Sequence, residues 1–416
     1  MIQKFTEDYT HFWKKSQPIF PFIPHKFSLR EKERREKILD QYIDSAKALR
    51  KGKQKLRKLT EKEEKHFFAG TRNFLIDGLD FNDQQLGVMF SDEVRKVTRE
   101  FVRQAREFDS TLTFHAIFQA IRNAWIMHGL QIVLGMPIRL TPSIFAYSLL
   151  YPYTDNLIDN PEISPFEKLV FSQNFYLRLD GQAIEPNSSA ERIIFNLVAM
   201  IELEFPRTDF PEVYQSLLAI HEAQTKSLQL IHSDGLLSET ETLKIGIAKG
   251  GASVLADGYL VAGKLNKDQE HFLFGYGAYL QLLDDIQDVE EDRAAGLHTI
   301  FSMNGESLEF KLNKTYWFGN LVMNCLPLFG GQYLEVFQSL MRKSIDLFII
   351  EAIAQNPGCY SMEYVSAIED HSPFSFSYIQ KQKEQLTPYN GFLLSAFQEI
   401  AFNEYMPAER EVVFEG

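Results

Sequence analysis

The feature that most constrains the fold is a helical spacing of apolar residues that recurs along most of the chain. In FHAIFQAIRNAWIMHGLQIVLG, residues 114–135, the positions of one face lie three or four residues apart, which is the period of an α-helix. Thr141-Pro142 has the form of an N-cap followed by proline at the first helical position, so a new helix is expected to begin there. Alternating apolar and polar runs bounded by turns are scarce. The sequence therefore predicts an all-α protein.

The same spacing, together with the residues that start and stop helices, predicts the extent of the other elements. Further helices are expected at residues 143–159, 164–179, 190–204, 211–232, 239–264 and 267–295. The first of these should bend near Pro152 and stop before Pro161, because proline removes a backbone donor and restricts the residue before it. We expect residues 101–416 to form one large helical domain and residues 1–100 a helical N-terminal extension.

Composition excludes several classes of protein. A net charge of −13 argues against a general nucleic-acid binder, which needs a dominant basic surface. The basic run at residues 26–66 is most simply a solvated helical face, although a docking surface for anionic lipid or a partner is the alternative. Only Cys325 and Cys359 occur, too few for a disulfide framework, and they fit a reducing cytoplasm. No apolar run reaches the roughly 18 residues of a membrane span.

The first acidic motif, Asp155-Asn-Leu-Ile-Asp159, lies at the end of an expected helix. Carboxylates four residues apart leave the same helical face, where like charges repel. The helix macrodipole also disfavours anions in the last turn. A bound cation would offset both costs. The structural alternative is that one aspartate caps the next turn and the other pairs with an arginine.

The second acidic motif is stronger, and it lies in YLQLLDDIQDVEEDR, residues 279–293. It contains four crowded aspartates, three of them at four-residue intervals: Asp284, Asp285, Asp288 and Asp292. The preceding segment GYGAYLQLL suits a buried helix, and Gly296 is a natural helix terminator. Because four carboxylates at the end of a buried helix repel one another, a cation site is favoured over a purely structural role.

The two motifs lie about 125 residues apart and can face each other across a helical bundle. Hard carboxylate oxygens suit Mg²⁺, which keeps several waters and bridges a few carboxylates to phosphate. The chain has no HExxH motif and no Cys/His quartet, which argues against zinc. It also has no GxxxxGK[ST] loop, so nucleotide hydrolysis on a P-loop is excluded. A magnesium site for a phosphate ester is the interpretation favoured.

These segments resemble the class I isoprenoid synthase superfamily. YLQLLDDIQD is similar to the second aspartate-rich segment of trans-prenyl diphosphate synthases, while DNLID and DVEED fit the DxxxD motifs of phytoene and squalene synthases. KGGAS, residues 249–253, resembles the lysine-bearing segment that contacts diphosphate in the chain-elongating enzymes. The combination is most similar to the bacterial large-terpene synthases, or class IB terpene synthases, over residues 115–300.

The resemblance implies an isoprenoid synthase helical bundle around a central cavity, with three Mg²⁺ ions when diphosphate is bound. The implied metal ligands, of which all but Asp292 are also the implied catalytic residues, are Asp155 and Asp159 on one wall and Asp284, Asp285, Asp288 and Asp292 on the other. The implied substrate-binding residues are Lys249 and Arg293 for diphosphate, Gln281 for positioning the second motif, and Tyr153 and Tyr259 for the apolar pocket.

Four functions fit these residues. The leading one is a terpene synthase that ionises one allylic prenyl diphosphate, C15 or longer, to a hydrocarbon or alcohol and pyrophosphate. The alternatives are a head-to-head condensing enzyme like phytoene synthase, a chain-elongating prenyltransferase and a non-catalytic helical binding module. The elongating enzymes carry an arginine pair shortly after the first motif, and residues 160–169 contain none. Peripheral membrane contact, through which a long prenyl substrate would arrive, and a homodimer stay open.

Overall fold

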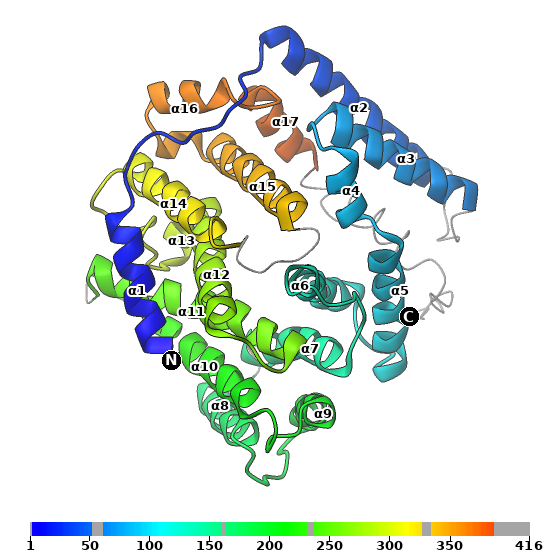
Figure 1. The fold of residues 1–416 in the computed structure, drawn as a ribbon, viewed down its shortest axis with the longest axis vertical. Helices are drawn as coiled ribbons and strands as arrows, with labels where there is room; N and C mark the ends of the chain where they lie inside the picture. Colours follow the sequence, from blue (N-terminus) through cyan, green and yellow to red (C-terminus); the bar gives the residue numbers. More distant parts are fainter. Residues whose placement is uncertain (1, 52–60, 160–162, 232–236, 327–333, 387–416) are drawn as a thin grey trace, which may run out of the picture. The chain divides into compact units, whose positions relative to one another are not determined.

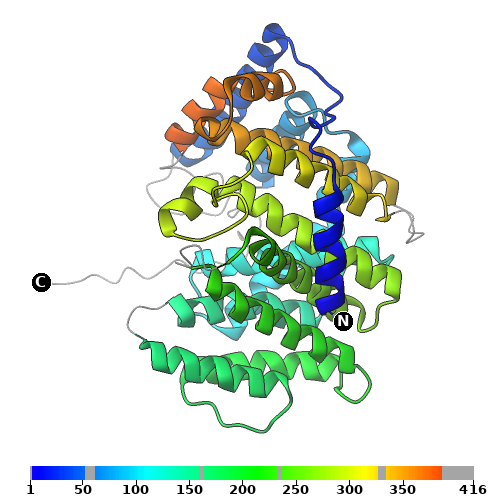
Figure 2. The same ribbon diagram turned by 90° about the vertical axis from the view of Figure 1, so that its left-hand side faces the viewer.

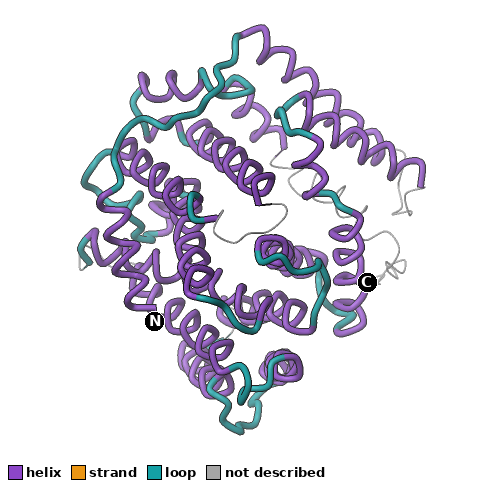
Figure 3. Tube along the Cα trace, in the orientation of Figure 1, coloured by secondary structure: helices purple, strands orange, loops and turns teal. Residues whose placement is uncertain are grey.

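The computed structural model describes residues 2–51, 61–159, 163–231, 237–326 and 334–386. The protein is 76% helical, and the described residues form no strand, as Figure 3 makes plain. This confirms the all-α prediction. The chain divides into two compact units, each drawn from separate stretches of sequence: residues 1–23 with 113–365, and residues 24–112 with 366–416.

The first unit contains α1 and the run from α6 to α15. Its helices are α1 (Ile2–Lys15), α6 (Phe114–Val133), α7 (Pro142–Asp159), α8 (Pro165–Leu179), α9 (Ser189–Glu204), α10 (Pro211–Ser227), α11 (Glu239–Ala262), α12 (Lys267–Gln287), α13 (Val289–Ala295), α14 (Leu308–Met323) and α15 (Leu334–Gln355). Two short 3₁₀ turns follow α10 and α15, η1 (Leu228–Leu230) and η3 (Pro357–Cys359). The expected helix 211–232 therefore ends early, at Ser227.

Several of these helices begin where the sequence carries a capping box. Ser238 caps α11 and Asn266 caps α12, and in each case the residue three positions on reaches back to the capping backbone. Gly263 ends α11 with φ 72°, a conformation that glycine adopts without strain. The α11–α12 hairpin is thus defined at both of its helix starts and at its turn.

The α11–α12 hairpin forms the centre of the first unit, with α1, α10 and α14 packed around it (Figure 1). The two backbones touch. A Cβ atom on Gly277 would lie 2.9 Å from the Cβ of Val254 and closer still to the carbonyl oxygen of Gly250. Only glycine at both positions lets the helices approach this closely, because close helix contact needs small residues at the crossing.

The N-terminal helix α1 packs on α11, α12 and α14, which lie far along the chain (Figure 2). The Tyr9 hydroxyl donates to the carbonyl oxygen of His271 at 2.6 Å. The indole nitrogen of Trp13 donates to the Thr315 hydroxyl at 2.9 Å, and Trp13 is almost fully buried. These contacts make α1 an integral part of the first unit.

The second unit contains α2 (Leu29–Lys51), α3 (Glu61–Asp77), α4 (Asp83–Met89), α5 (Asp92–Phe108) and α17 (Phe376–Leu386), while α16 (Met362–Glu369) spans the boundary. Arg35 of α2 is buried and donates to the carbonyl oxygen of Gly78 at 2.6 Å and to Asp80 at 2.8 Å. The rings of Tyr42 and Phe74 stack 5.3 Å apart. These contacts hold α2 against α3. Among the helices described in either unit, none combines the length and the apolar character that crossing a bilayer requires.

Candidate metal and phosphate site

The site lies where α11 crosses α12, beside the Gly250–Gly277 contact. Lys249 immediately precedes this crossing. A Cβ atom on Gly250 would lie 2.5 Å from the Cβ of Gln281, so Lys249 stands next to the turn of α12 that leads into the aspartates. Burial raises the pKa values of Asp284, Asp285 and Asp292, and the charge of Lys249 opposes this rise in all three. The structure therefore brings the lysine and the second acidic motif together.

One continuous helix was expected over residues 267–295. The structure instead places the aspartates on two consecutive helices. The helix is interrupted at Asp288, where φ is −93° and ψ is 14°, so α12 ends at Gln287 and α13 begins at Val289. The turn-to-turn hydrogen bonds persist on both sides, from the Asp288 amide to Asp284 at 3.0 Å and from the Asp292 amide to Asp288 at 2.8 Å. The interruption is thus local.

Asp285 is the most buried carboxylate of the motif, with 9% of its surface exposed. Burial is the largest cause that raises its pKa to about 7, and the charges of Asp292 and Asp284 add to it. Gln281 donates from Nε2 to Asp285 Oδ1 at 2.8 Å, which opposes the rise. This hydrogen bond is the contact that a residue positioning the second motif would make.

The neighbouring carboxylates are also short of positive charge. Burial, together with the charges of Asp288 and Asp284, raises the pKa of Asp292 to about 6. Asp284 reaches solvent, yet enough protein surrounds it that burial raises its pKa as well. Because burial raises these pKa values, a bound cation would favour the charged forms of the carboxylates.

Arg122 is a site residue that the sequence did not indicate. It lies on α6 and its side chain is exposed, and its charge, like that of Lys249, opposes the rise that burial causes in the pKa of Asp284. A third helix therefore contributes a cation to the site. Helical spacing predicted α6, but nothing in the spacing revealed that Arg122 faces an aspartate on α12.

Two of the expected substrate-binding residues have their described contacts elsewhere. The guanidinium of Arg293 donates to the carbonyl oxygens of Phe301 and Ser302, both at 3.3 Å. The Tyr259 hydroxyl donates to Glu270, and it lies ten residues from Lys249 along α11, about 15 Å at 1.5 Å per residue. Tyr153 is half-buried on α7.

The first acidic motif lies at the end of α7, whose described residues run to Asp159. The helix continues through Pro152. The side chains of Asp155 and Asp159 lie outside the part of the chain that the structure describes. α7 packs against both α6 and α11, the helices that carry Arg122 and Lys249.

A buried polar cluster joins these same three helices. Asn123 of α6 donates to the Ser148 hydroxyl of α7 at 3.3 Å and also to the carboxylate of Asp257 on α11. Asp257 is 1% exposed, and burial raises its pKa far above the usual range of a carboxyl. Within the described residues its Oδ1 atom has no hydrogen-bond partner. Burial therefore favours the neutral form of Asp257.

The chemistry of the second motif fits a magnesium ion shared with a phosphate. Among the described residues, no three acidic, histidine or cysteine side chains are grouped closely enough to form a metal site by themselves. Mg²⁺ does not need such a cage, because it is usually bound by one or two carboxylates together with substrate phosphates and water. Asp284, Asp285, Asp288 and Asp292 supply hard oxygen donors of this kind.

Comparison with protein-family models and with curated protein sequences gives no match. The likeness to isoprenoid synthases therefore rests on the residues of the motifs alone. What the geometry adds is that Lys249 and the second motif, separated by 35 positions in sequence, share one site.

Proposed function

We propose that the protein is a class I terpene synthase, which ionises one allylic prenyl diphosphate with Mg²⁺ and releases a hydrocarbon or alcohol and pyrophosphate. The observation that carries the proposal is the grouping of Lys249 and Arg122 with the second acidic motif. Carboxylates beside cations suit a ligand that is itself a phosphate bound to metal. A cytoplasmic location belongs to the same proposal and rests on cysteine usage alone.

In this proposal the protein stabilises the charge of the leaving group. When an allylic C–O bond breaks, the electron pair stays on the diphosphate, and donors aimed at its oxygens lower the barrier. Lys249 and Arg122 would bind those oxygens directly. Bound Mg²⁺ would act as a Lewis acid that neutralises the same charge. The buried residues Leu282, Leu283 and Ile286 would keep water away from the base of the site.

A reaction on one substrate is favoured over chain elongation. Elongation requires cations for a second diphosphate near the first motif. Arg178 is the first arginine after that motif, and its guanidinium is held by both carboxylate oxygens of Glu202, at 2.6 and 2.5 Å. Arg207 binds the same carboxylate at 2.8 Å. These arginines are occupied in a clamp between α8 and the end of α9.

The test is incubation with Mg²⁺ and prenyl diphosphates from C10 to C25, each alone and with isopentenyl diphosphate. Released pyrophosphate and organic products are measured together. We expect turnover of a single allylic diphosphate of C15 or longer, with no longer product when isopentenyl diphosphate is added. A prenyl diphosphate lengthened only in its presence would contradict the proposal and favour elongation. A hydrocarbon of twice the substrate's carbon number would favour head-to-head condensation.

A further inference from the structure

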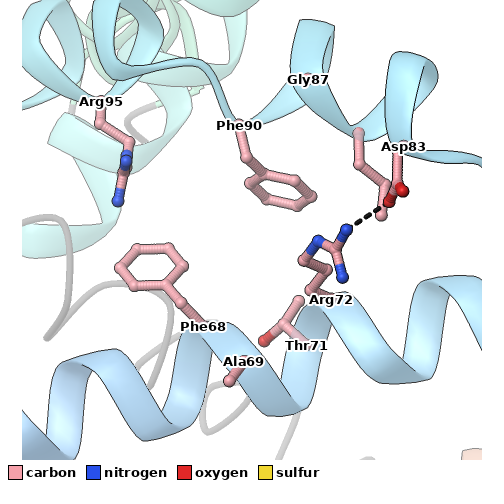
Figure 4. A pocket seen from close by; sticks show the side chains of 9 residues that line it. Phe68, Ala69, Thr71, Arg72, Asp83, Gly87, Phe90 and Arg95 are labelled. Atoms are coloured by element: carbon pink, nitrogen blue, oxygen red, sulfur yellow. Dashed lines mark hydrogen bonds and ion pairs between the residues drawn. The ribbon is translucent and has the colours of Figure 1, made fainter.

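The second unit has a pocket of its own, between α3, α4 and the start of α5 (Figure 4). Its volume is about 320 Å³, within the range of pockets that hold small molecules. No aspartate of the second acidic motif lines it, and neither does Lys249. The pocket is therefore separate from the proposed reaction site.

Two aromatic rings form its apolar walls. Phe68 comes from α3 and Phe90 follows α4, and Figure 4 shows both rings directed into the pocket from different walls. Both side chains are only half-buried. Ring faces favour flat apolar partners, so the space between them suits an aromatic or other planar group.

Two arginines give the pocket its charge preference. Arg72 and Arg95 both line it, and the Arg95 guanidinium carbon lies 5.5 Å from the centre of the Phe68 ring. Arg72 pairs with Asp83 and Arg95 with Asp92, in each case through one terminal nitrogen. Such exposed ion pairs contribute little to stability. A guanidinium carries five N–H donors, so each arginine can also bind an anionic ligand.

Gly87 leaves the pocket open. It lies inside α4, where glycine destabilises a helix relative to alanine. Its φ is not positive, and a Cβ atom built on it would meet nothing within 4 Å. Neither backbone conformation nor packing among the described residues therefore requires glycine here. What glycine provides at this position is empty space.

We propose that this pocket binds a small amphipathic anion, with a planar apolar group between Phe68 and Phe90 and a phosphate or carboxylate on Arg72 and Arg95. The apolar walls explain affinity for the body of such a ligand. The two guanidinium groups explain preference for its charge. This binding does not depend on the proposed terpene synthase activity.

The first experiment measures binding to the full-length protein by calorimetry, with EDTA present so that a magnesium site does not contribute. The probes are phenyl phosphate, benzoate, inorganic phosphate and phenol. We expect phenyl phosphate or benzoate, or both, to bind at least about ten-fold more tightly than inorganic phosphate and phenol, and the two show which anion is preferred. If neither binds more tightly than the probes that carry only one of the two features, the proposal is wrong.

Variants then locate the binding. Gly87→Leu should fill the pocket and abolish binding without lowering the thermal midpoint, because the added atoms enter open space. Arg72→Gln and Arg95→Gln should each weaken binding about ten-fold or more. Gly87→Ala and Arg103→Gln are the controls, and both should bind the ligand as the wild type does. Arg103 pairs with Glu107 further along α5 and does not line the pocket. Binding that survives Gly87→Leu, or survives both arginine variants, overturns the assignment.

Discussion

At the scale of single residues, the cations beside the second acidic motif are the most direct test of the proposed chemistry. Lys249→Ala and Arg122→Ala should each lower kcat/KM for diphosphate release by roughly ten- to one-hundred-fold. The reason is that a hydrogen bond to a charged group contributes about 1.5–3 kcal/mol. The measurement is pyrophosphate release against substrate concentration.

Lys244→Ala is the matched control, because Lys244 lies on the same helix five residues earlier and its charge acts on Glu241. It should leave kcat/KM close to that of the wild type. Equal effects of Lys244→Ala and Lys249→Ala would mean that helix α11 tolerates neither change, and would remove the special role of Lys249.

The buried acid Asp257 makes a prediction about stability and pH. Below the unfolded pKa of about 3.9 the carboxyl is protonated in both states. Above it, the unfolded chain releases the proton while the folded protein keeps it, because burial raises the folded pKa. The free energy of unfolding therefore decreases as pH rises from the unfolded pKa toward the folded pKa, by about 1.4 kcal/mol per pH unit.

Asp257→Asn removes this dependence, since asparagine has the same shape and does not ionise. Urea denaturation at pH 5 and pH 8 should show the variant gaining stability over the wild type as pH rises. The exposed Asp209 supplies the control Asp209→Asn, whose difference from wild type should stay constant. Parallel pH profiles for Asp257→Asn and wild type would show that Asp257 ionises normally.

At the scale of elements, the α11–α12 crossing depends on two glycines. Gly277→Ala should lower the free energy of unfolding by at least about 2 kcal/mol, because an overpacked contact costs about 1–3 kcal/mol and here the added atom meets backbone. Chemical denaturation gives the value. Gly246→Ala is the control on α11, where the nearest atom to a new Cβ is Asp285 Oδ2 at an ordinary 3.8 Å. A Gly277→Ala variant as stable as Gly246→Ala would contradict the close crossing.

The helices were largely predictable because the residues that cap them are close in sequence to the helix ends. Helix α11 was expected at 239–264 and runs from Glu239 to Ala262, since Ser238 and Gly263 act through neighbouring backbone groups. The interruption at Asp288 was not predictable. It changes one ψ angle while the flanking hydrogen bonds persist, and no proline or glycine marks it.

At the scale of the whole molecule, the features that could not be predicted are contacts between residues distant in sequence. The resemblance to isoprenoid synthases implied that Lys249 and the second motif act on the same diphosphate, and the α11–α12 hairpin returns one beside the other. Arg122 could not be assigned beforehand, because its role depends on which side of α6 is turned toward Asp284. The expectation for Arg293 came from the resemblance to isoprenoid synthases, but its donors go to the carbonyl oxygens of a following loop.

The packing of α1 against distant helices yields a prediction at this scale. Trp13→Ala should destabilise the protein by about 3–5 kcal/mol, as expected for a buried tryptophan that fills a packed interior. Phe12→Ala, at a neighbouring position that is 42% exposed, should cost far less. Urea denaturation of the full chain compares the two. Similar losses for both variants would mean that α1 contributes little to the first unit.

The same contact has a consequence for how the protein is made. Trp13 finds its partner at Thr315, which emerges from the ribosome about 300 residues later. At about 5–20 residues per second, the apolar face of α1 waits roughly 15 to 60 seconds for the surface that covers it. During that interval Phe5, Tyr9 and Trp13 are exposed on a nascent chain. Helix α1 is thus synthesised well before the helices that bury it, and we expect it to be the segment that chaperones protect.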